Sequence, residues 1–69
     1  MLDPRLISDE GLIGFDDMMT ECVLKIEKIS PLAINVWREV LIELDRRGKI
    51  RLVSGSYDDI GNALIERKI

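Results

Sequence analysis

The sequence predicts a mainly α-helical domain with one short β element, and three observations carry that prediction. Apolar residues recur with the period of an α-helix over about 15–29 and again over 31–47. Residues 49–54 then alternate polar and apolar side chains, which indicates a short strand. The length of 69 residues allows one core, so we treat 1–69 as a single small domain.

The opening segment carries a weaker helix signal. Asp3 is a suitable N-cap and Pro4 a suitable first helical residue, so a short helix through Leu6 and Ile7 that fades at Gly11 is expected. Gly11 and Gly14 interrupt any longer pattern, because glycine is a poor helix former. A long helix is therefore expected only from residue 15.

The predicted helix 15–29 carries its apolar residues in an arc of roughly 140°. Asp16 and Asp17 are expected in its first turn, where the helix dipole favours negative charge. Lys25 and Lys28 lie near its end, where the dipole favours positive charge. The apolar stripe consists of Phe15, Met18, Met19, Cys22, Val23, Ile26 and Ile29.

The predicted helix 31–47 has clear ends, with Ser30 as N-cap, Pro31 at the first position and Gly48 after the last turn. Its apolar arc of roughly 200° is wider than one facing helix covers. The helix is therefore expected either at the centre of the chain or at an interface with another chain. Trp37 is expected in the core, with an interface anchor as the alternative. The candidate interface residues are Leu32, Ile34, Trp37, Leu41 and Ile42.

Residues 57–69 leave two alternatives open. Ser56 followed by Asp59 favours a helix that turns Ile60, Ala63 and Leu64 inward. Gly61-Asn62 favours a turn instead, which would make 63–69 the return strand of a hairpin.

No residue pattern indicates catalysis, a cofactor or a metal. The chain has no histidine, the commonest general base, and its one cysteine, Cys22, lies on an apolar stripe where a thiol stays protonated. Adjacent carboxylates at 16–17 and 58–59 diverge by roughly 100° on a helix, so they do not converge on a substrate. The lone cysteine also excludes a disulfide within the chain and argues against a zinc site. We therefore expect a protein that is not an enzyme and has no small-molecule substrate.

Four basic residues, Arg46, Arg47, Lys49 and Arg51, lie close together in the last turn of the second predicted helix and just after it. Residues 30–53, a helix that ends in Leu-Asp-Arg-Arg-Gly-Lys-Ile and runs into a short strand, resemble the recognition helix and wing of winged helix-turn-helix domains. The resemblance implies that 15–29 is the preceding helix. It also implies that Asn35, Arg38 and Glu39 face the DNA groove and that Arg51 and the turn 54–56 form the wing. Against DNA binding, the polar face of the helix also carries Glu39, Glu43 and Asp45.

The composition favours a protein that acts through protein contacts. A domain this small hides only about 60% of the surface of its unfolded chain, so a second subunit would add stability that the chain lacks. The apolar content of 46% is ample, and the net charge of −3 comes from a mixed surface. We expect a small non-enzymatic regulatory or adaptor protein, as a homodimer or bound to a larger protein.

The alternative is a winged-helix-like DNA-binding transcriptional regulator that contacts DNA through Arg38, Arg46, Arg47, Lys49 and Arg51. No stretch reads as a secretory signal or a membrane span, so no membrane association and a cytoplasmic location are expected.

Overall fold

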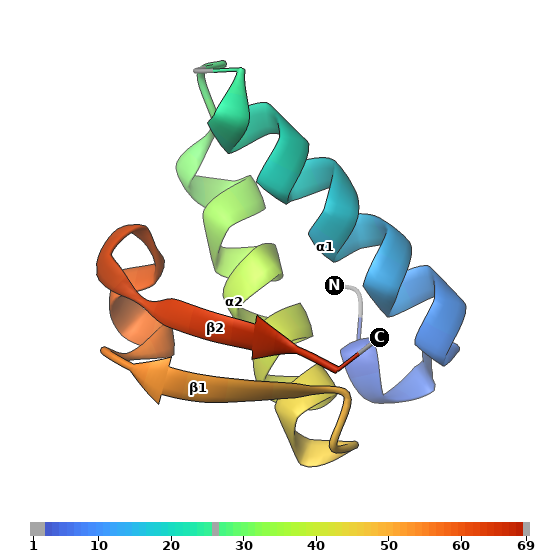
Figure 1. The fold of residues 1–69 in the computed structure, drawn as a ribbon. Helices are drawn as coiled ribbons and strands as arrows, with labels where there is room; N and C mark the ends of the chain where they lie inside the picture. Colours follow the sequence, from blue (N-terminus) through green and yellow to red (C-terminus); the bar gives the residue numbers. More distant parts are fainter. Residues whose placement is uncertain (1–2, 26, 69) are drawn as a thin grey trace.

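The computed structural model describes residues 3–25 and 27–68. Within those ranges the chain forms the 3₁₀ helix η1 (Pro4–Leu6), the α-helices α1 (Asp9–Leu24) and α2 (Pro31–Arg46), the strand β1 (Ile50–Ser54), the 3₁₀ helix η2 (Tyr57–Asn62) and the strand β2 (Leu64–Arg67). The two α-helices meet at a corner, and the β1–β2 hairpin lies across α2 (Figure 1). The predicted class, mainly α with a short β element, is confirmed.

The helix α1 begins and ends earlier than predicted. Ser8 is its N-cap, and the Ser8 hydroxyl accepts a hydrogen bond from the Gly11 amide at 3.2 Å. Gly11 and Gly14 lie inside the helix, because this cap and the burial of Leu12 outweigh a glycine cost of about 1 kcal/mol each. The predicted range 15–29 was therefore wrong at both ends. Ile26, one member of the predicted stripe, lies outside the described residues.

The buried face of α1 also differs from the predicted stripe. Leu12, Asp16 and Met19 are buried, whereas Met18 and Val23 are half exposed. Asp16 lies in the middle of the helix, so its assignment to the first turn was wrong. This difference follows from tertiary packing. The face of α1 that packs against α2 contains Asp16, because the Asp16 carboxylate has hydrogen-bond partners there.

The helix α2 begins at its predicted residue and supplies most of the core. The Ser30 hydroxyl accepts a hydrogen bond from the Ala33 amide at 3.1 Å, and Gly48 adopts a φ of 76° after the last turn. α2 contacts α1 on one side and the hairpin elements β1 and η2 on another, which explains much of its wide apolar arc. The core consists of Leu12, Met19, Trp37, Val40, Leu41, Leu44 and Ile50.

The C-terminal part of the chain combines both predicted alternatives. Ser56 caps η2, a 3₁₀ helix rather than an α-helix, and β2 then returns antiparallel to β1. The register places Ile50 opposite Arg67 and Leu52 opposite Ile65, with an irregularity before Ser54. The Tyr57 hydroxyl donates to the Asp45 carboxylate at 2.9 Å and fastens η2 to α2. In the described part of the chain, no helix combines the length and apolar character that a bilayer crossing needs.

Candidate protein-binding groove

A buried carboxylate joins three elements at the centre of the molecule. Asp16 on α1 is only 1% exposed. Its carboxylate accepts hydrogen bonds from the Trp37 indole at 3.0 Å and from the Arg67 guanidinium at 2.7 and 2.8 Å. Arg67 also donates to the Thr20 hydroxyl at 3.3 Å. This polar cluster, Asp16, Thr20, Trp37 and Arg67, ties β2 to both α-helices.

The cluster holds Asp16 ionised at neutral pH. Burial alone raises the pKa of the Asp16 carboxyl, but the Arg67 guanidinium and the Trp37 indole lower it more, so the pKa lies below its ordinary value. A carboxylate held in this way neither gives nor takes a proton near pH 7. The role of Asp16 is therefore structural.

Beside this cluster an apolar groove opens between α1 and β2. Its volume is about 230 Å³. A cavity of about 150 Å³ already holds a benzene molecule, so the groove has room for a large apolar side chain. The groove is lined by Thr20, Val23, Leu24, Trp37, Ile60, Ala63, Leu64, Ile65 and Arg67.

The groove extends from the hydrophobic core to the surface and is open to solvent. Val23 lies about one helical turn after the buried Met19 and so on the inward side of α1, yet it is 50% exposed. Leu24 and Leu64 on either side of the groove are 78% and 60% exposed. Arg67 of the hairpin therefore contacts α1 at Asp16 and Thr20, whereas the apolar side chains of the last turn of α1 stay exposed.

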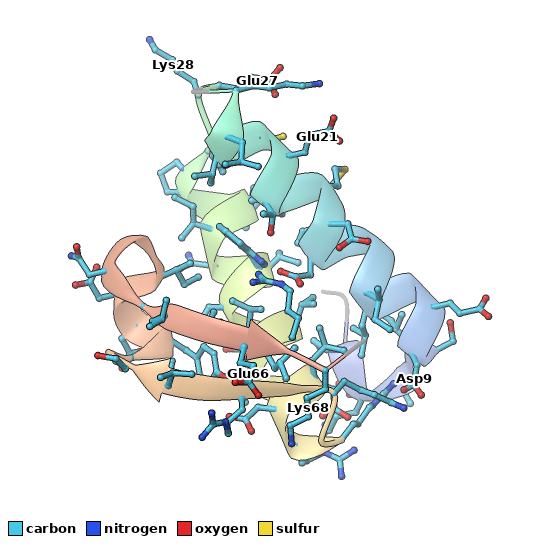
Figure 2. All side chains as sticks on the ribbon, in the orientation of Figure 1. Asp9, Glu21, Glu27, Lys28, Glu66 and Lys68 are labelled. Carbon is cyan, nitrogen blue, oxygen red and sulfur yellow. The ribbon has the colours of Figure 1, made fainter. Side chains whose placement is uncertain are left out.

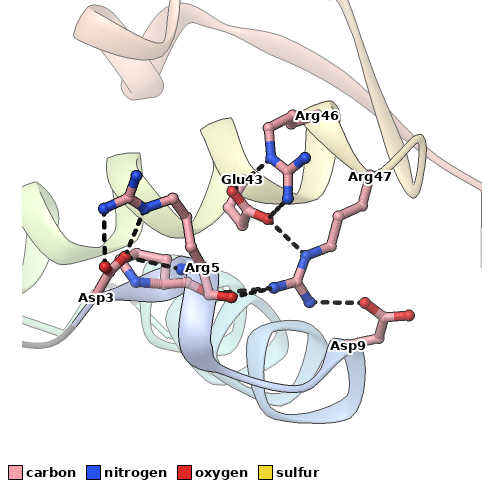
Figure 3. Close-up of polar contacts among 7 residues, drawn as sticks. Asp3, Arg5, Asp9, Glu43, Arg46 and Arg47 are labelled. Atoms are coloured by element: carbon pink, nitrogen blue, oxygen red, sulfur yellow. Dashed lines mark hydrogen bonds and ion pairs between the residues drawn. The ribbon is translucent and has the colours of Figure 1, made fainter.

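A second hollow, of about 510 Å³, lies between η1 and α2 next to an ion-pair network (Figure 3). Glu43, whose side chain is buried, accepts hydrogen bonds from Arg46 at 2.6 Å and Arg47 at 2.7 Å. Arg47 also donates to Asp9 at 2.8 Å and to backbone carbonyls of η1. These groups hold η1 and the start of α1 against the end of α2, which is a structural role.

The ion pairs of Glu43 make the stability depend on pH. The guanidinium groups of Arg46 and Arg47 lower the pKa of Glu43 from 4.5 to about 2. Because the folded-state pKa is the lower one, the ion pairs stabilise the fold fully above pH 4.5, and this contribution is lost as the pH falls toward 2.

We expect urea unfolding at a series of pH values to show a stability that falls over that range, less steeply in Glu43→Gln than in the wild type. The exposed Glu66→Gln is the matched control. An equal pH dependence in Glu43→Gln and the wild type would contradict the assignment.

Every basic residue proposed above as a DNA contact has a carboxylate within 4.0 Å. Arg47 is the most enclosed of them, with a side chain 17% exposed. DNA contact by these residues stays a prediction, and each contact would have to replace an existing partner. The pairs are Arg38 with Glu39 and Asp58, Arg46 with Glu43, Arg47 with Glu43 and Asp9, Lys49 with Asp9, and Arg51 with Glu66.

The predicted interface residues of α2 do not form one surface. Leu41 is fully buried in the core, so its placement at an interface was wrong. The expected core position of Trp37 is confirmed, and Trp37 also lines the groove. Leu32, Ile34 and Ile42 are exposed, but successive residues of a helix turn by about 100°. Leu32 and Ile34 therefore point roughly 160° apart. The groove residues Val23 and Leu64 were not identified, because their exposure depends on where the hairpin lies.

The described residues hold no group of three or more His, Cys, Asp or Glu side chains that could bind a metal ion. The neighbouring Glu27 raises the pKa of the Cys22 thiol, so that thiol is protonated at neutral pH. Comparison with known families, curated proteins and solved structures found no match for this chain.

Proposed function

We propose that this chain is a small non-enzymatic regulatory or adaptor protein that acts by binding protein, with the groove between α1 and β2 as its binding surface. The observation that carries the proposal is the exposure of Val23, which faces inward and still meets solvent over half its surface. Contiguous exposed apolar surface next to polar groups is typical of protein interaction sites. A bound protein segment would cover the apolar side chains of the groove that the hairpin leaves exposed.

The charges around the molecule also support a protein partner. The basic residues near the end of α2 have carboxylate neighbours, and the net charge is −3. A nucleic-acid partner needs positive charge that is open to phosphates. Figure 2 shows charged side chains at both ends of the molecule, with Glu21, Glu27 and Lys28 near the corner of the helices and Asp9 and Lys68 near the opposite end. The groove between these ends is apolar.

We expect Val23→Lys to weaken binding at the groove. A suitable probe is a phage-displayed library of ten-residue linear peptides, panned on the wild-type protein and followed by measurement of the dissociation constant of each selected peptide. A lysine in the groove leaves a charge facing the apolar side chains of the peptide, so its affinity is expected to fall at least about tenfold.

The matched control is Met18→Lys. Met18 lies on the same helix with 51% exposure and does not line the groove. Equal affinities of the two variants would overturn the groove as the binding surface. Light scattering over a dilution series measures self-association separately. A dimer that Val23→Lys dissociates and Met18→Lys retains would identify the partner as a second copy.

A further inference from the structure

One wall of the groove is an open strand edge. Among the residues that the structure describes, β2 pairs with β1 on one side only, and the Lys68 amide donates to the Lys49 carbonyl at 3.0 Å. In an antiparallel pair, hydrogen-bonded and non-hydrogen-bonded residue pairs alternate. With the observed register, Glu66 directs its backbone N–H and C=O groups toward β1. Ile65 and Arg67 direct theirs away from β1.

This open edge lies on the groove side of β2. Ile65 and Arg67 both line the groove, and the Arg67 side chain crosses from β2 to Asp16 and Thr20 on α1. The edge of β2 that does not pair with β1 therefore faces the second half of α1 (Figure 1). The groove combines unpaired backbone donors and acceptors on one wall with the apolar side chains of Val23 and Leu24 on the other.

We infer that the groove binds an extended segment of another protein, which pairs with Ile65 and Arg67 as a third strand and packs alternate apolar side chains against Val23 and Leu24. The inference rests on the proposed function and adds the form of the partner. Strand addition to an exposed edge is an established way to bind a peptide, because the main chain supplies affinity and alternate side chains supply specificity. A bound helix would leave the edge unpaired, since its backbone groups already bond to one another.

The size of the groove favours a single segment over a globular partner. Nine residues line it, whereas a stable interface between two folded proteins involves about 20 to 30 residues on each side. A second copy of this chain fits poorly in one two-fold register. In the two-fold register that pairs Ile65 with Arg67 of the other copy, the two Glu66 side chains would lie opposite each other. Like charges in that position destabilise a sheet.

The strand inference is tested by Ile65→Pro, with peptides selected from the same library. The Ile65 amide points away from β1, so proline removes the outward donor and leaves the β1–β2 ladder intact. We expect selected peptides to alternate apolar and polar residues and to bind Ile65→Pro about tenfold more weakly. Ile65→Val keeps the donor, so the loss of affinity in Ile65→Pro relative to Ile65→Val measures the contribution of the Ile65 amide.

A second measurement does not depend on how Ile65→Pro folds. Each residue of a selected peptide is N-methylated in turn and titrated against the wild-type protein. Loss of binding at every second residue is expected, because alternate amides of a strand face β2.

Methylation effects without a period of two, or selected peptides with apolar residues at helical spacing, would overturn strand addition. If Val23→Lys still weakened binding, the groove would stand as the binding surface. Peptides that bind Val23→Lys as well as the wild type, or a panning that enriches no peptide, would overturn both proposals.

Discussion

Replacing Asp16 with alanine is expected to destabilise the protein by about 2–4 kcal/mol, which is a large share of its total stability. The change leaves the Trp37 indole and the Arg67 guanidinium without the acceptor that they share, at 3.0 and 2.7 Å. Removing one partner of a buried ion pair costs about 3–5 kcal/mol. The expected value is lower because the Arg67 side chain is 32% exposed and water can partly replace the carboxylate.

Urea unfolding followed by circular dichroism measures this effect, and Asp17→Ala is its matched control. Asp17 is the next residue of the same helix and is exposed, so its replacement is expected to change the stability by about 0.5 kcal/mol or less. Similar effects of the two substitutions would contradict the structural role of Asp16. Loss of the Asp16 contacts should also loosen the end of β2, which is visible as faster hydrogen exchange of the Lys68 amide, because this amide donates to the Lys49 carbonyl.

The second large effect is expected from Leu41→Ala. Leu41 is fully buried at the centre of α2, so the substitution removes apolar contacts and leaves a cavity. Leucine-to-alanine changes in such positions cost about 2–5 kcal/mol, and a domain of this size loses roughly 4–8 °C of melting temperature per kcal/mol. Thermal unfolding is therefore expected to shift by about 10 °C or more.

The neighbouring Ile42→Ala is the control for that measurement. Ile42 is 43% exposed and lies outside the core, so a much smaller loss of stability is expected. If Ile42→Ala destabilised the protein as much as Leu41→Ala, the side of α2 that faces the core would have to be reassigned. The comparison also separates burial from helix propensity, because both changes place alanine in the same helix.

Local signals predicted the second helix and the first strand closely. Ser30, Pro31 and Gly48 act through backbone groups within a few residues of themselves, so their effect is visible in the sequence. The start of the first helix was predicted too late because Gly11 and Gly14 were expected to interrupt the helix as they would in an isolated peptide. In the folded protein the burial of Leu12 and the Ser8 cap decide the helix start.

The candidate site was much less predictable. Val23 was placed on the apolar stripe of its helix, and the period of the sequence does indicate an inward direction for it. Whether an inward residue is covered depends on the length and position of the hairpin. The sequence left open whether Leu64 belonged to a helix or a strand, so neither the open edge of β2 nor the groove beside it was predicted.

By itself, the sequence determined the fold class, the boundaries of α2 and the position of β1, because caps and periodicity act over a few neighbouring residues. Only the tertiary structure decided that Asp16 is buried while Asp17 is exposed. The partners that make this burial favourable, Trp37 and Arg67, lie 21 and 51 residues away along the chain. A charged side chain is buried only where such partners pair with it. Partners that are distant along the chain cannot be identified from the residues next to the charge.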